Sequence, residues 1–145
     1  VPGKSVIDLG CGSGILSIAA LSLGASHAVA VDIDPKAVDV AYENAALNGI
    51  GKDRYLVRAG DVISATALAN ALSQEKYHLV LANIVADVII PLSVRVPAML
   101  EEDGVFLCSG IIDTRAEEVK GKLLEAGLTI LEERSSEGWF AFTCK

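Results

Sequence analysis

The chain of 145 residues is poor in the residue types that bind metals and nucleic acids. It has three cysteines without a C-x-x-C pair and only two histidines, too few clustered ligands for a structural zinc site. Its 12 lysines and arginines are scattered singly and outnumbered by 19 aspartates and glutamates, whereas electrostatic binding of nucleic acid needs clustered cations. We therefore predict no metal site and no direct contact with nucleic acid.

The sequence also lacks a continuous apolar segment of the membrane-spanning kind. Its longest stretch free of Asp, Glu, Lys and Arg, residues 9–31, is long enough to cross a bilayer but is interrupted by four glycines and four serines. A charged segment followed by an apolar one, which marks an export signal, does not open the chain. An odd number of cysteines is typical of a reducing compartment. These features predict a cytoplasmic protein that does not bind membranes.

Apolar residues make up 52% of the chain, which excludes intrinsic disorder and is enough for one core in one domain. Short apolar runs alternate with stretches of helical periodicity. The patterns predict strands at 5–9, 28–31, 55–59, 77–82, 105–111, 128–133 and 139–144, and helices at 15–23, 35–47, 65–72, 86–100 and 115–126. Pro91 and Pro97 predict a kink in the fourth of these helices, or its division into two.

Only four residues, 135–138, separate the last two expected strands. That connection is too short for a helical crossover, so these strands must form an antiparallel hairpin. The fold class is therefore α/β: a Rossmann-like, doubly wound, mostly parallel seven-stranded sheet with a C-terminal antiparallel hairpin.

Open α/β sheets bind their ligands at the carboxyl ends of the strands, and the first expected strand ends in a glycine loop. The run Asp8-Leu-Gly10-Cys-Gly12-Ser-Gly14 lets a ligand approach the backbone and the start of the following helix. A dehydrogenase of the G-x-G-x-x-G type is disfavoured, because Ile15 stands where its third glycine would be. The G-x-G-x-G spacing instead resembles motif I of class I S-adenosylmethionine-dependent methyltransferases, with an ordinary tight turn as the alternative.

The second expected strand ends at Asp32, 22 residues after Gly10. An acidic side chain about 20 residues after a glycine loop binds ribose hydroxyls in nucleotide-binding folds. Asp32 could instead cap the next helix, but Asp34 stands directly before Pro35 and fits that position better. We therefore predict that Asp32 binds the ribose of a nucleoside cofactor.

The resemblance to these methyltransferases also implies functions for residues at two further strand ends. It implies that Asp61, after Gly60, lies beside the adenine, although a simple turn is also consistent with these residues. Asn83, at the mouth of an apolar strand, resembles the Asp or Asn that orients the attacking nitrogen in amine methyltransferases. A neutral amide suits this task because it accepts a hydrogen bond without holding the amine in its charged form. Ile84 and Val85 replace an aromatic motif that would favour nucleobases.

A closer resemblance covers essentially the whole chain, through Trp139. Its segments are 6–20, 31–35, Glu43-Asn-Ala45, Asn48-Gly49, Leu81-Ala-Asn-Ile84, Ala86-Asp87, 89–92 and Ser109-Gly-Ile111. Together they resemble the catalytic domain of the bacterial methyltransferases that modify ribosomal protein L11. The resemblance implies that Gly10, Asp32 and Asn83 bind S-adenosyl-L-methionine. We also expect Gly12 to bind this cofactor and Asp8 to lie at its amino-acid portion.

The same resemblance implies a substrate, the stalk-base protein of the large ribosomal subunit, methylated on its N-terminal amine and on lysine side chains. Asn83 would be the catalytic residue as well as a cofactor contact. We expect residues 1–145 to form one methyltransferase domain without the family's N-terminal substrate-recognition domain. Two alternatives stay open: a fragment that binds the cofactor without turnover, and a methyltransferase for small amines. We expect Trp139 to pack in the core or at its rim.

Overall fold

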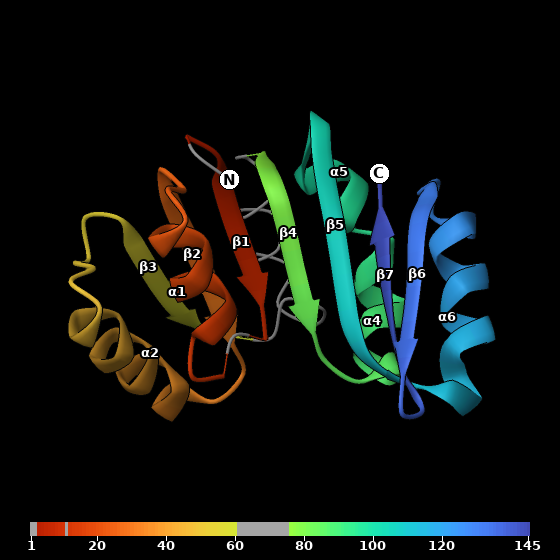
Figure 1. Cartoon of the computed structure of the whole chain (residues 1–145), viewed down its shortest axis with the longest axis horizontal. Coiled ribbons are helices and arrows are strands. Elements are labelled where there is room, and N and C mark those ends of the chain that lie inside the picture. The colour runs from red at the N-terminus through yellow and green to blue at the C-terminus, as the bar shows by residue number, and fades with distance from the viewer. Residues whose placement is uncertain (1–2, 11, 61–75) are drawn as a thin grey trace.

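The structure is a computed structural model that describes residues 3–10, 12–60 and 76–145. One seven-stranded sheet runs through the molecule in the order β3-β2-β1-β4-β5-β7-β6, with helices on both faces (Figure 1). Its strands are β1 (Ser5–Leu9), β2 (His27–Asp32), β3 (Tyr55–Ala59), β4 (Tyr77–Asn83), β5 (Leu100–Ile112), β6 (Ile130–Ser136) and β7 (Trp139–Cys144). The described helices are α1 (Ile15–Ser22), α2 (Pro35–Leu47), α4 (Ala86–Ser93), α5 (Val96–Met99) and α6 (Asp113–Glu125).

Pairing within the sheet confirms the fold class. β1, β2, β3, β4 and β5 pair in parallel, whereas β7 pairs antiparallel with both β5 and β6. The hairpin is therefore present as expected, and its second strand lies between β5 and β6. The short connection accounts for the pairing of β7 with β6, and the pairing of β7 with β5 places it between the two strands.

Successive residues of the central strands point to opposite faces and pack into two cores. Val6 and Ala30 pack with α1 and α2 on one face, and Ile7 and Val31 pack with α4, α5 and α6 on the other. In Figure 1, α1 lies in front of the sheet and α4 and α5 lie behind it. Every residue of β1 is buried, as is typical of a central parallel strand, and three of its five residues, Val6, Ile7 and Leu9, are apolar.

Most element boundaries agree with the sequence to within two residues. Asp34 caps α2, with its side chain accepting a hydrogen bond from the Lys36 amide at 2.9 Å, and the two prolines divide residues 86–99 into α4 and α5. β5 begins five residues before the expected position, because Leu100 already pairs with Tyr77, ahead of a shift in register between Tyr77 and Leu79. The helix expected at 65–72 lies outside the described residues.

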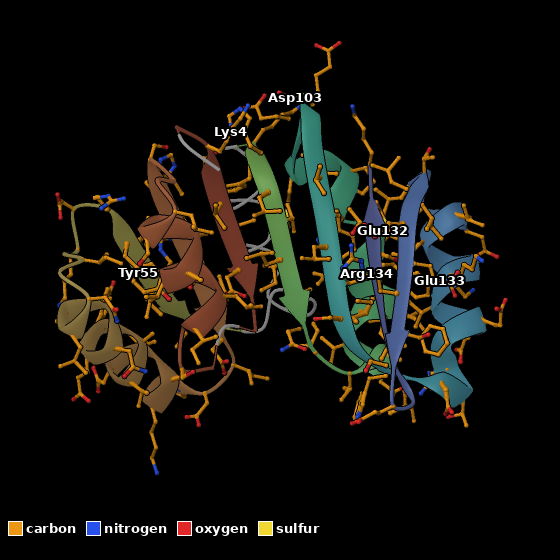
Figure 2. All side chains as sticks on the ribbon, in the orientation of Figure 1. Lys4, Tyr55, Asp103, Glu132, Glu133 and Arg134 are labelled. Carbon is orange, nitrogen blue, oxygen red and sulfur yellow. The ribbon has the colours of Figure 1, made fainter. Side chains whose placement is uncertain are left out.

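The parallel strands all end at one edge of the sheet, which is the lower edge in Figure 1. The turn between β6 and β7 lies at this edge too. Lys4 and Asp103, whose charged groups are 3.5 Å apart, lie at the opposite edge (Figure 2). The lower edge therefore gathers the glycine loop, Asp32, Asn83 and Trp139. No helix among residues 3–10, 12–60 and 76–145 has the length and apolar character needed to cross a membrane.

Candidate functional site

A cavity of about 250 Å³ opens at the carboxyl edge between β1, α1 and β4. Its lining residues are Asp8, Gly10, Gly12, Ser13, Ile15, Leu16 and Asn83. The first strand and the fourth are neighbours in the sheet, so residues 75 positions apart in the chain, Asp8 and Asn83, face one cavity. Four of the residues that we expected to bind the cofactor therefore lie together: Asp8, Gly10, Gly12 and Asn83.

Gly10 makes the tight turn that brings the loop over the cavity. Its φ of +79° lies in the left-handed region, which residues with a side chain rarely adopt. Its amide donates a hydrogen bond to the Val31 carbonyl at 2.7 Å. A Cβ at this position would overlap Cγ2 of Ile84. Gly10 thus allows the loop to lie directly against the end of β4, beside Asn83. By contrast, a Cβ on Gly12 would meet nothing within 4 Å, so that residue faces open space.

Asp32 is joined to the glycine loop by hydrogen bonds from the backbone. One carboxylate oxygen accepts from the Gly12 amide at 2.8 Å, and the other accepts from the Asp34 amide at 2.9 Å. Each oxygen has two acceptor positions, so one on each stays available for a ligand hydroxyl. The side chain is only partly buried. Asp32 is therefore held in a fixed orientation at the cavity's edge with capacity to accept two more bonds.

Asn44 is a residue whose role was missed in the sequence. Its side-chain amide donates to the Ser13 carbonyl at 2.9 Å and so ties α2 to the glycine loop. Asn44 lies within a segment that carried the family resemblance, but a lone Asn in a helix gives no signal of such a contact. Beneath the loop, the hydroxyls of Ser17 and Tyr55 lie 2.6 Å apart, and Figure 2 shows Tyr55 beside α1.

Asn83 ends β4 with an exposed side chain. No hydrogen bond to its amide is formed within the described part of the chain, so both its donor and its acceptor are available. Its oxygen lies close to the backbone of Gly110 on β5, where an added Cβ would be 2.7 Å away. The amide thus stands between the cavity and the end of β5.

Asp8 is buried, with 1% of its surface exposed, and neither carboxylate oxygen has a hydrogen-bond partner among the residues that the structure describes. Burial raises the pKa of Asp8 from 3.8 to about 6, since a low dielectric disfavours the charged form. The nearby polar groups of Ser17 oppose this shift without forming a well-aligned hydrogen bond, and the charge of Asp32 adds to it. An unpartnered carboxylate that lines a cavity is a natural receptor for a cationic or hydrogen-bond-donating ligand.

Replacing Asp8 with asparagine is expected to stabilise the ligand-free protein. The folded-state pKa of Asp8 lies above the unfolded value, so the wild-type protein loses stability as pH rises from 3.8 through 6. Full ionisation costs about 3 kcal/mol of unfolding free energy above that range. Urea unfolding at several pH values should show Asp8→Asn gaining this amount near pH 7 and nothing at pH 3.5. A gain independent of pH would contradict this origin, and the exposed Asp39→Asn is the control.

Asp61 is the remaining residue predicted to bind the cofactor, and His78 is one of the chain's two histidines. Asp61 lies outside the described residues. His78 is near the amino end of β4, where its Nδ1 lies 3.0 Å from the Ser5 hydroxyl, so it has a structural contact far from the cavity. In the described ranges no group of three or more His, Cys, Asp or Glu is arranged to hold a metal ion.

Known proteins share this fold and this sequence to different degrees. A solved structure of a putative S-adenosylmethionine-dependent methyltransferase from Streptococcus mutans superposes with a TM-score of 0.83 at 18% identity, over 99% of this chain and 45% of that one. At such low identity the likeness shows the fold alone. The strand order and the glycine loop therefore define a domain with the fold of class I methyltransferases.

Sequence similarity is more specific. The family model described as ribosomal protein L11 methyltransferase (PrmA) matches residues 1–145. The L11 methyltransferase of Agathobacter rectalis is 40% identical over 141 residues, which are 97% of this chain and 44% of that protein. The crystal structure of the L11 methylase of Lactobacillus delbrueckii subsp. bulgaricus has a TM-score of 0.89 at 31% identity, over 100% of this chain and 70% of that one. The chain belongs to the ribosomal protein L11 methyltransferase family, and spans less than half the length of the curated relatives it matches.

Proposed function

We propose that this chain binds S-adenosyl-L-methionine at the carboxyl edge of the sheet and transfers its methyl group to primary amines of ribosomal protein L11. The accepting groups would be the N-terminal amine and lysine side chains. The observation that carries this proposal is the gathering of Asp8, the glycine loop, Asp32 and Asn83 around one edge, in a chain that belongs to the L11 methyltransferase family.

The residues present fit this cofactor. The cavity of about 250 Å³ is smaller than typical ligand sites of 300–1,000 Å³, so we infer that it takes the amino-acid portion. The unpartnered Asp8 carboxylate at its base suits the cationic amino group there. Asp32, with one free acceptor position on each oxygen, suits the two ribose hydroxyls. Asp61 is proposed for the adenine on the family resemblance alone.

The chemistry needs alignment more than acid or base groups. When bound, the cofactor supplies a methyl group already activated by its sulfonium centre. Asn83 would accept a hydrogen bond from the neutral amine through its side-chain oxygen and so direct the nitrogen lone pair towards that methyl. Because an amide carries no charge, it stabilises the protonated amine, which cannot attack, much less than a carboxylate would. The substrate ammonium loses its proton to water before the attack, and the product forms as the methylated ammonium.

The proposed function is tested first by binding and then by transfer. Calorimetric titration of the purified protein should show saturable heat with S-adenosylhomocysteine and none with NAD; the reverse pattern would overturn the proposal. Mass spectrometry of L11 after incubation with S-adenosylmethionine should show added methyl groups on its amines. Binding without transfer would support a fragment that only binds the cofactor, and transfer to butylamine but not to L11 would support a small-amine enzyme.

We propose the cytoplasm as its compartment, since the substrate is a ribosomal protein. Direct contact with nucleic acid is not part of the proposal, because the charge of −7 and the scattered cations give no surface for phosphate binding.

A further inference from the structure

Two clefts meet at Gly110 and Trp139, beside Asn83. One, of about 290 Å³, is lined by Val85, Ala86, Asp87, Gly110, Ile112, Arg115 and Trp139. The other, of about 430 Å³, is lined by Ser109, Gly110, Arg134, Ser135, Ser136, Trp139, Phe140 and Ala141. Both lie at the carboxyl edge, where the turn between β6 and β7 approaches the end of β5 (Figure 1). Neither cleft shares a lining residue with the cavity of the glycine loop. The clefts lie close to that cavity because Gly110, which lines both of them, is next to Asn83.

Gly110 connects these clefts with Asn83. Its φ is +81°, and β5 changes register against β7 between Cys108 and Ile111, around this residue. A Cβ on Gly110 would lie 2.7 Å from Oδ1 of Asn83 and 3.4 Å from the carbonyl oxygen of Ile84. The absence of a side chain therefore leaves the acceptor of Asn83 accessible from the clefts. A regular β5 strand with a side chain here would cover it.

Trp139 is the only tryptophan in the chain, and 54% of its surface is exposed. It pairs with Ile112 across the β5–β7 ladder, and Ile112 and Val85 are also exposed, at 44% and 60%. The sequence suggested core or rim packing for Trp139, and the structure places it on the rim. Three large apolar side chains are thus exposed beside the path from the clefts to the Asn83 amide. Side chains that served only to fill the core would be buried.

Both arginines that line the clefts are held in ion pairs. Asp87 forms an ion pair with Arg115 at 2.9 Å, and Arg115 also bonds Glu118 at 2.8 Å, so two carboxylates face one guanidinium. On the other side Arg134 pairs with Glu132 (Figure 2), and Glu137 and Asp113 stand at the turn before Trp139. These ion pairs border an apolar slot with an aromatic wall, which suits the aliphatic stem of an amine-bearing side chain.

We propose that Gly110 and Trp139 form the entrance through which the amine-bearing side chain of the substrate reaches Asn83. The aliphatic stem packs against the Trp139 ring, and the nitrogen passes over Gly110 to the Asn83 oxygen. This inference rests on the proposed amine methylation and adds to it the specificity of the route: a long, unbranched primary amine fits, and a nucleobase does not.

The test uses the kinetics of L11 methylation. Trp139→Ala should raise the KM for L11 about tenfold, the effect expected from loss of one aromatic and cation contact, with affinity for S-adenosylhomocysteine changed less than about twofold. Trp139→Phe should keep most of the wild-type KM, which separates a lost contact from a damaged hairpin. Leu47→Ala, at an exposed apolar residue at the end of α2, should change neither value.

A second readout needs no turnover. With one tryptophan in the chain, fluorescence reports on Trp139 alone, so tryptophan-free L11 added with S-adenosylhomocysteine should shift the emission to shorter wavelength. L11 with acetylated amines should produce a much smaller shift. Gly110→Ala should lower kcat at least tenfold, because its methyl group would displace the Asn83 amide, without weakening S-adenosylhomocysteine binding.

Each failure has a separate meaning. If the wild-type protein binds S-adenosylhomocysteine and methylates L11 but Trp139→Ala leaves KM unchanged, the inference is wrong and the proposed function stands. It is also wrong if the free protein already emits like a buried tryptophan, because another segment would then cover this surface. If the wild-type protein binds no S-adenosylhomocysteine, the proposed function fails and the inference fails with it.

Discussion

Replacing Asp32 with alanine is expected to weaken the binding of S-adenosylhomocysteine by roughly 10²- to 10⁴-fold. Each hydrogen bond from a ribose hydroxyl to a carboxylate contributes about 1.5–3 kcal/mol, and Asp32 has one acceptor position left for each of the two hydroxyls. Their loss corresponds to about 3–6 kcal/mol of binding free energy. Calorimetry on the purified variant measures this directly.

The loop around Asp32 supplies the controls for this experiment. Asp34→Ala removes a carboxylate two residues away that caps α2, so it should cost about 1 kcal/mol of unfolding free energy and little affinity. Asp32→Asn keeps an acceptor oxygen and should give an intermediate loss. A thermal melt identifies any variant that has unfolded. If folded Asp32→Ala binds S-adenosylhomocysteine as tightly as the wild type, Asp32 does not hold the ribose.

The sequence predicted the fold well because its signals are local. Glycines mark the strand-to-helix turns, Asp34-Pro35 marks the start of α2, and the four residues before Trp139 allow only a hairpin. The place of β7 between β5 and β6 depends on tertiary pairing that no local pattern encodes. For the same reason, the five-residue extension of β5 was not predicted.

The site could be predicted only in part. Strand ends identified Asp8, Gly10, Gly12 and Asn83, which the parallel sheet brings to one cavity. Asp32 lies at the edge of that cavity through its bond to Gly12. The contact of Asn44 with the glycine loop, the approach of Gly110 to Asn83 and the exposure of Trp139 all depend on side chains from distant segments. A sequence pattern cannot report how closely two strands approach, so these residues emerged only from the structure.

Asn83→Ala is expected to reduce the rate of methyl transfer by ~100-fold or more, with affinity for S-adenosylhomocysteine changed less than about threefold. The amide has no hydrogen bond to any described residue, so its removal breaks no hydrogen bond within the fold that the structure describes. What it removes is the group proposed to direct the attacking nitrogen, and misplacement of a reacting atom by about 1 Å costs on the order of 10²-fold in rate. Single-turnover kinetics beside calorimetry separates transfer from binding. Equal losses in both would make Asn83 a cofactor contact only.

The isosteric Asn83→Asp variant tests the reason for an uncharged amide. A carboxylate at this position would accept the same hydrogen bond but would also stabilise the protonated amine, whose unperturbed pKa in lysine is about 10.4. Its rate of transfer should therefore fall most near neutral pH and recover as pH rises, with the whole rate profile displaced towards higher pH than that of the wild type. A profile that falls uniformly at every pH would indicate lost geometry and would contradict the argument for neutrality at Asn83.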